Sequence, residues 1–142
     1  YVNGNAYGTT KKSVEEARAR GKNVILDVDT IGAMKIRALC PDATLVYILP
    51  PSWDELKSRL SSTGIYNKEE VNALMEIAEE EISCANSYDY ILVNDTISNT
   101  LSRFAQIIHS NRYSRNCMKE FLDSYIDGEV KPHVQSYKEA LL

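Results

Sequence analysis

The chain has 142 residues, which is enough for one domain with a hydrophobic core. Its 16 Lys and Arg residues against 20 Asp and Glu residues give a net charge of −4, which argues against a general nucleic-acid binder or a membrane-surface binder. The sequence holds no apolar run long enough to span a bilayer and no signal-peptide pattern, so we expect no membrane span.

The cysteines Cys40, Cys84 and Cys117 are odd in number and widely spaced, so they indicate neither a disulfide framework nor a zinc pattern. His109 and His133 form no cluster with them, and we expect no structural metal site. Free cysteines are typical of a reducing compartment, which favours a cytoplasmic location.

The first ten residues, YVNGNAYGTT, are rich in Gly, Asn and Thr and predict a turn and loop. A helix is predicted over residues 11–20. Either Thr9 or Thr10 can cap its first turn, and Gly21 stands where a glycine often follows the end of a helix.

The next segment, residues 23–32 (NVILDVDTIG), contains a short apolar run interrupted and ended by the acids Asp27 and Asp29. A continuous apolar run of this length predicts a strand that is buried on both faces, as in a parallel sheet. The two carboxylates would emerge on one side of its C-terminal end, where open α/β sheets bind ligands. The alternative, a strand end with solvated acids, stays open on this run alone.

Helical and strand patterns then alternate along the rest of the chain. This alternation predicts βαβ units and a mostly parallel sheet. Glu76, Glu79, Glu80 and Glu81 are interpreted as the solvated face of a long helix. Further strands are expected at residues 43–49 and 88–94, and further helices at residues 31–39, 53–60, 68–84, 97–110 and 116–126.

Four segments, in this order and with similar gaps, resemble the guanylate kinase family, the P-loop ATP:GMP phosphotransferases. They are GNAYGT (residues 4–9), ILDVD (25–29) with a glycine three residues on, ILPPS (48–52) before a helix ending in Arg-Leu, and YDYILVND (88–95). The resemblance implies an α/β fold with a P-loop nucleoside-monophosphate-kinase-like parallel sheet and flanking helices.

The resemblance covers about three quarters of the chain. It implies a partial guanylate-kinase-like domain at residues 1–112, with a lid at about residues 61–83, and leaves residues 113–142 as a C-terminal helical extension.

Roles for five residues follow from the resemblance alone. Tyr7 and Thr9 would hold the phosphate of GMP, since both hydroxyls can donate to its oxygens. Asp29 would accept hydrogen bonds from the guanine edge. Asp27, a candidate catalytic residue, would lie toward magnesium and the phosphates. Asn94 resembles the residue near the adenine of ATP. A different interpretation of Thr9, as a cap for the helix that follows it, stays open.

The sequence also departs from the family pattern. No G-x-x-x-x-G-K-[ST] phosphate loop occurs in it. In the family this loop, its strand and the arginines that recognise GMP precede the position of Tyr1. We therefore expect that an N-terminal portion with the P-loop strand is absent from these 142 residues, or that another segment supplies it.

In the family's lid, three arginines neutralise charge on the transferred phosphoryl group. The first is retained as Arg59, a candidate catalytic residue. The other two positions are Thr63 and Leu74. Lys68 lies nearby, but a lysine lacks the bidentate fork of arginine.

Three hypotheses for the function of the chain stay open. The first is a catalytically weak or inactive binding module, similar to the guanylate-kinase-like domains of membrane-associated scaffold proteins, which bind phosphorylated peptides through the GMP-side surface. A protein partner would then use this surface or the C-terminal extension. The alternative is an active guanylate kinase that uses ATP, Mg²⁺ and GMP, with its P-loop outside these residues. The third is a structural subunit without any ligand.

Overall fold

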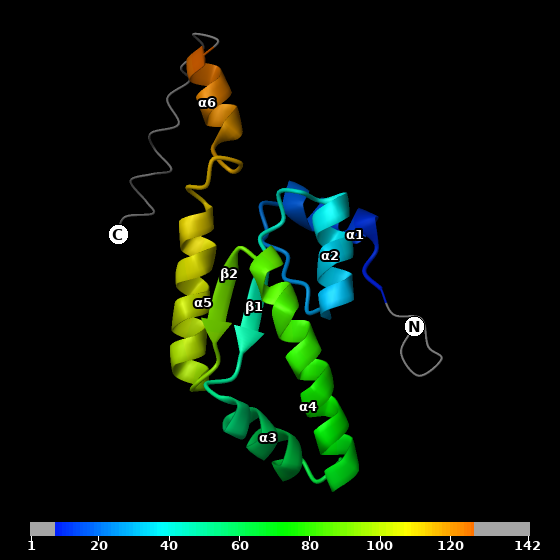
Figure 1. Cartoon of the computed structure of the whole chain (residues 1–142). Helices are drawn as coiled ribbons and strands as arrows, with labels where there is room; N and C mark the ends of the chain where they lie inside the picture. Colours follow the sequence, from blue (N-terminus) through cyan, green and yellow to red (C-terminus); the bar gives the residue numbers. More distant parts are fainter. Residues whose placement is uncertain (1–7, 127–142) are drawn as a thin grey trace.

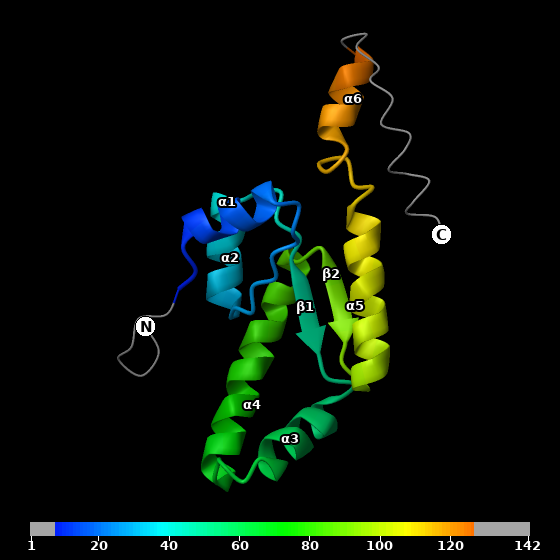
Figure 2. The ribbon, with the colours of Figure 1, turned by 180° about the vertical axis from the view of Figure 1, so that it is seen from behind.

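A computed structural model describes residues 8–126 of the chain. In this range two short parallel strands, β1 (Val46–Leu49) and β2 (Tyr90–Val93), pair with Val46 opposite Tyr90. Helix α5 (Ile97–Asn111) runs along the β2 side of this sheet, and α4 (Lys68–Ile82) runs along the β1 side (Figures 1 and 2). The mixed architecture and the parallel pairing confirm the α/β prediction in its coarse form.

The N-terminal helices lie at the end of the sheet where α4 finishes (Figure 1). Helix α1 covers Lys11–Ala19 and α2 covers Thr30–Leu39, close to the predicted bounds. Gly21 has φ +71°, a left-handed conformation that glycine adopts without a Cβ clash, so it ends the α1 turn as the sequence predicted.

The segment predicted as the lid, at about residues 61–83, contains the end of one helix, a turn and the whole of the next helix. Helix α3 (Trp53–Ser62) is capped by Ser52, whose Oγ accepts from the Glu55 N–H. Helix α4 begins with a capping box between Asn67 and Glu70, in which each side chain accepts from the backbone N–H of the other residue.

Helix α4 continues into a short 3₁₀ helix, η1 (Ser83–Ser87), which leads to β2. The last described helix, α6 (Lys119–Ile126), lies beyond the end of α5 (Figure 1). No helix in the described part of the chain is both long and apolar enough to cross a bilayer.

The strand predicted at residues 24–29 is not formed. This segment is irregular, and Ile25 and Val28 expose 65% and 46% of their surface, so the expectation of a strand buried on both faces is wrong. The run has a strand-like composition, but strand propensity depends on a paired neighbour. Neither β1 nor β2 pairs with it, and no other strand occurs within residues 8–126.

An ion pair joins α2 to the sheet. Arg37 Nη2 lies 2.6 Å from Asp89 Oδ2, and the same oxygen accepts from the Leu45 N–H at 2.7 Å. Arg37 Nη1 also donates to the carbonyls of Pro41 and Ala43. The network therefore fixes the end of α2 against the residues that precede β1 and β2.

We expect Asp89→Ala to lower the free energy of unfolding by about 1–3 kcal/mol, because it leaves a charged guanidinium and a backbone N–H without their shared acceptor. Asp42→Ala is the matched control, since Asp42 is exposed nearby and should change stability by less than about 0.5 kcal/mol. Urea unfolding of both variants measures the difference. Equal effects would show that the network adds nothing to stability.

Candidate functional site

The loop before α1 carries Thr9, while Tyr7, its predicted partner, lies outside the described residues. Thr10 caps α1: its Oγ1 accepts from the Ser13 N–H at 3.3 Å. The alternative interpretation of Thr9 as the helix cap is therefore wrong. Thr9 is exposed, and its hydroxyl is available to a ligand.

Asp29 has a structural role that the sequence analysis missed, because it is the N-cap of α2. Its Oδ1 accepts from the Gly32 N–H at 2.6 Å. A Cβ at position 32 would lie 2.9 Å from this oxygen and 3.1 Å from the Val28 Cβ, so a larger residue would force the capping carboxylate or Val28 to shift. Asp29 is exposed, and its second oxygen has no partner among the described residues. One oxygen holds the helix and the other can accept from a ligand.

Asp27 lies two residues earlier in the irregular segment. Its carboxylate is exposed and makes no hydrogen bond or ion pair with another described residue. In the described part, no three His, Cys, Asp or Glu side chains gather into a metal site. Mg²⁺ bound with nucleotide phosphates needs only one or two protein carboxylates, and a solvated aspartate oxygen is a ligand of the kind it takes.

At the carboxyl end of β2, Asn94 is held by contacts on both its main chain and its side chain. Its N–H donates to the Leu49 carbonyl at 2.7 Å, and its Oδ1 accepts from Thr100 Oγ1 at 3.0 Å. With the oxygen so occupied, the amide nitrogen of Asn94 keeps its donors for a ligand.

Asp95 follows, and two arginines converge on it. Arg59, in the last turn of α3, pairs with Glu55 at 2.8 Å, and its Nη2 donates to the Asp95 carbonyl at 3.4 Å. Arg103 Nη2 lies 3.0 Å from Asp95 Oδ2, and Asn99 donates to the same oxygen. The structure thus brings Arg59 and Asn94 to one end of the sheet.

The sequence analysis did not identify Arg103. Its signal is the spacing of positions 95, 99 and 103, which places Asn99 and Arg103 one helical turn apart on the face of α5 that looks back at Asp95. The hydrogen bond from the Thr96 N–H and those from Arg103 and Asn99 lower the pKa of the Asp95 carboxyl, against a smaller opposing effect of burial.

Because the pKa of Asp95 is lower in the folded chain, its contribution to stability is present above the unfolded value of about 3.9 and is lost as the pH falls through the folded value. We expect wild-type protein to lose more stability than Asp95→Asn between about pH 6 and about pH 3. Urea unfolding at the two pH values measures this. An identical pH dependence in both proteins would contradict the assignment.

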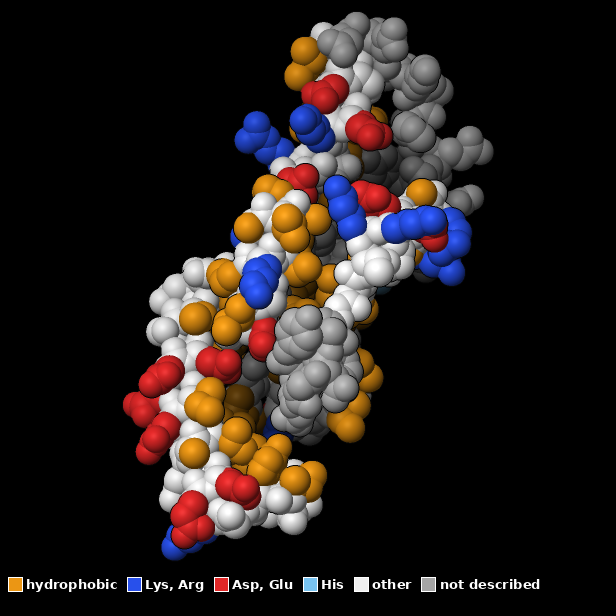
Figure 3. Space-filling view, turned by 90° about the vertical axis from the view of Figure 1, so that its right-hand side faces the viewer, with side chains coloured by type: hydrophobic (Ala, Val, Ile, Leu, Met, Phe, Trp, Pro, Cys, Tyr) orange, Lys and Arg blue, Asp and Glu red, His pale blue; other side chains and the backbone are white. Residues whose placement is uncertain are grey.

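The helix of the predicted lid is strongly acidic. Helix α4 carries one lysine, Lys68, against six glutamates. Trp53, Met75, Glu76 and Glu79 line a hollow of about 270 Å³ between α3 and α4. Figure 3 shows acidic side chains gathered over the lower part of the molecule, where α4 lies, whereas most Lys and Arg side chains on this face lie higher.

The positions that should carry the further lid arginines are neutral. Thr63 is exposed and its hydroxyl donates to the Leu60 carbonyl, while Leu74 is half-buried on α4. The prediction of a solvated acidic face holds for Glu76, Glu79 and Glu80 but not for Glu81. The Glu81 side chain is half-buried and accepts a hydrogen bond from Thr30.

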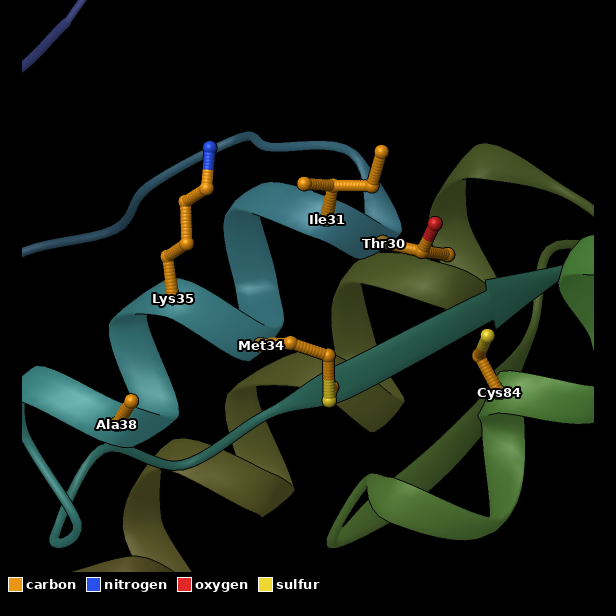
Figure 4. Close-up of a pocket in the computed structure, with 6 residues that line it drawn as sticks. All are labelled: Thr30, Ile31, Met34, Lys35, Ala38 and Cys84. Atoms are coloured by element: carbon orange, nitrogen blue, oxygen red, sulfur yellow. The ribbon is translucent and has the colours of Figure 1, made fainter.

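A second hollow, of about 420 Å³, lies against α2. Its walls are largely apolar, and Figure 4 shows Met34 and Cys84 on opposite sides of it, with Thr30 and Ile31 at the start of the helix. The hollow therefore borders the turn that holds Asp29. No hydrogen bond or ion pair connects Asp29 with Arg59 or Asn94 within the described residues.

The family model described as guanylate kinase matches residues 1–111. The chain belongs to the guanylate kinase family. Among its relatives, the guanylate kinase of Francisella tularensis subsp. tularensis (strain FSC 198) is 44% identical over 108 residues, which cover 75% of this chain and 57% of the relative. The guanylate kinase of Clostridium acetobutylicum is 37% identical over 137 residues, covering 96% and 64%.

A guanylate kinase of Thermus thermophilus is 37% identical over 120 residues, covering 84% of this chain and 54% of the relative. The chain thus spans between about half and two thirds of the length of these relatives. The clostridial match reaches into residues 113–142, so part of the segment expected to be an extension has a counterpart in that relative. The domain boundary at residue 112 stays a prediction.

Proposed function

We propose that this chain is a guanylate-kinase-family domain that binds GMP on its acceptor side and transfers phosphate weakly or not at all. Tyr7, Thr9 and Asp29 would bind GMP, with Asn94 toward ATP. The observation that carries the proposal is the charge of the lid, where six glutamates and one lysine occupy the helix that should present arginines.

The acceptor side supports GMP binding. Thr9 is exposed and is not needed as a helix cap, so its hydroxyl can donate to a phosphate oxygen. Asp29 has one carboxylate oxygen that is not used in the cap. The guanine edge presents N–H donors, which a carboxylate accepts through charge-assisted hydrogen bonds.

The lid opposes phosphoryl transfer for electrostatic reasons. Charge spreads over the oxygens of the transferred group in the transition state, and one arginine placed there is worth on the order of a thousandfold or more in rate. Arg59 already pairs with Glu55, and Glu76 and Glu79 add negative charge to the hollow between α3 and α4. These carboxylates would repel the phosphates that a kinase lid must neutralise.

The GMP-side surface could instead bind a protein partner that carries a phosphorylated side chain. Such a partner could also bind the segment after residue 112. A structural subunit without any ligand is a separate alternative, in which GMP would not bind. The proposal also includes a cytoplasmic location, because Cys40, Cys84 and Cys117 are free thiols, which are typical of a reducing compartment.

An active guanylate kinase is the second candidate, and the retention of both Asp27 and Asp29 favours it. Asp27 would be the protein ligand for magnesium held with ATP, and that ion would neutralise charge on the phosphates. The relatives matched by the chain are named guanylate kinases, which also favours this candidate.

Thermal-shift titration of the full chain with GMP, AMP and inorganic phosphate tests the proposal. We expect a stabilisation by GMP that saturates with concentration, as ligands that bind only the folded state produce. AMP is the matched control, because adenine lacks the adjacent N1–H and N2–H₂ donors of guanine from which Asp29 would accept hydrogen bonds. Equal shifts with GMP and AMP, or no shift with GMP, would contradict the proposed acceptor site.

A further inference from the structure

Glu81 differs from the other acids of α4. It lies in the last turn of the helix, is half-buried, and its Oε1 accepts a hydrogen bond of 3.3 Å from Thr30 Oγ1. Within residues 8–126 this is the one hydrogen bond between α2 and α4. Thr30 directly follows Asp29 and is the first residue of α2 (Figure 4). The contact therefore joins the base of the lid helix to the turn that carries the proposed guanine acceptor.

Two aromatic rings pack at the same junction. Tyr47 of β1 and Tyr88, which precedes β2, meet edge to face with ring centroids 4.9 Å apart. Burial is the largest cause of the raised pKa of both phenols. At Tyr47 the charge of Glu81 comes next, whereas at Tyr88 the contributions of Tyr47 and Cys84 precede those of Glu81 and Asp29. These electrostatic effects accompany the Thr30–Glu81 hydrogen bond, which joins the start of α2 to the end of α4.

We propose that Glu81 is a positioning residue that couples the Asp29–Thr30 turn to the lid helix α4, so that occupation of the acceptor site restrains the lid. The inference rests on the proposed function, because it needs GMP at Asp29. Glu81 would act through Thr30 and would not touch the nucleotide. Glu81 lies in the last turn of α4, directly before the 3₁₀ helix η1, so the restraint would act on this end of the helix.

Hydrogen–deuterium exchange of the full chain with and without GMP tests the coupling. We expect GMP to slow exchange in α4 of the wild-type protein by about threefold or more, because a restrained helix opens less often. Thr30→Val keeps the shape of the side chain but removes the hydroxyl donor, and it should abolish this slowing. Thr30→Ser restores a hydroxyl and should restore the slowing. Glu80→Gln, on the exposed neighbouring residue, is the matched control and should respond like wild type.

The outcomes separate the coupling from a merely structural contact. A contact that only stabilises the fold would speed exchange in Thr30→Val equally with and without GMP, and that result would overturn the proposal. If Thr30→Val does not fold, Glu81→Ala removes the acceptor from the other side and is expected to lose the same GMP response. GMP binding with an unchanged α4 response in these variants overturns the coupling alone. No GMP binding by wild type overturns the proposed function and the coupling together.

Discussion

Replacing Asp29 by alanine should lower the affinity for GMP by about tenfold to a hundredfold, because a hydrogen bond to a charged group is worth about 1.5–3 kcal/mol. The same variant should lose about 1 kcal/mol of stability, since the Gly32 N–H loses its cap. Calorimetric titration with GMP and urea unfolding measure the two effects separately.

Asp29→Asn is the control that separates the two roles. Its amide oxygen can still accept from the Gly32 N–H, and Asn caps helices as well as Asp does. The amide has no charge and offers a weaker acceptor to guanine. We expect stability to stay within a few tenths of a kcal/mol of wild type while GMP affinity still falls. An Asn variant that binds GMP like wild type would remove Asp29 from the proposed site.

Thr63→Arg should raise the rate of phosphoryl transfer from ATP to GMP by about tenfold or more. The increase should not exceed the roughly thousandfold rate enhancement that an arginine at the transferred phosphoryl group can supply. Thr63 is exposed at the end of α3, in ordinary helical conformation, so a longer side chain fits without disturbing the core. A coupled assay that follows ADP formation at saturating ATP, Mg²⁺ and GMP measures the change.

Thr63→Gln is the matched control, because it lengthens the side chain without adding charge. We expect its rate to stay near that of wild type. If Thr63→Arg and Thr63→Gln behave alike, the missing charge at position 63 does not limit the reaction. The acidic hollow around Glu76 and Glu79 would then be the next feature to change.

The helices and both observed strands were predictable because their signals are local. Capping residues and apolar periodicity place α1 and α4 within two residues of their observed ends. The conformation of residues 24–29 was not predictable in the same way, because a strand-like composition specifies a strand only when a neighbouring strand pairs with it. The structure leaves Ile25 exposed there.

The roles assigned to single residues of the family motifs stay predictions. Arg59 and Asn94 do lie near each other at the end of β2, although no sequence pattern indicated the distance between them. Contacts between distant segments were not predictable. The hydrogen bond between Thr30 and Glu81 spans 51 residues, and no local pattern indicates it. The capping role of Asp29 was overlooked because the acid was assigned to a strand end.

One measurement tests the central claim most directly: the turnover of the full chain under conditions where GMP binding is shown to be saturated. ADP formation from ATP and Mg²⁺ is followed at a GMP concentration fixed by calorimetric titration of the same sample. The account predicts saturable GMP binding with a rate far below the roughly 1–100 s⁻¹ typical of kinases. Turnover within that range, abolished by Asp29→Ala, would contradict it and identify the chain as an active guanylate kinase.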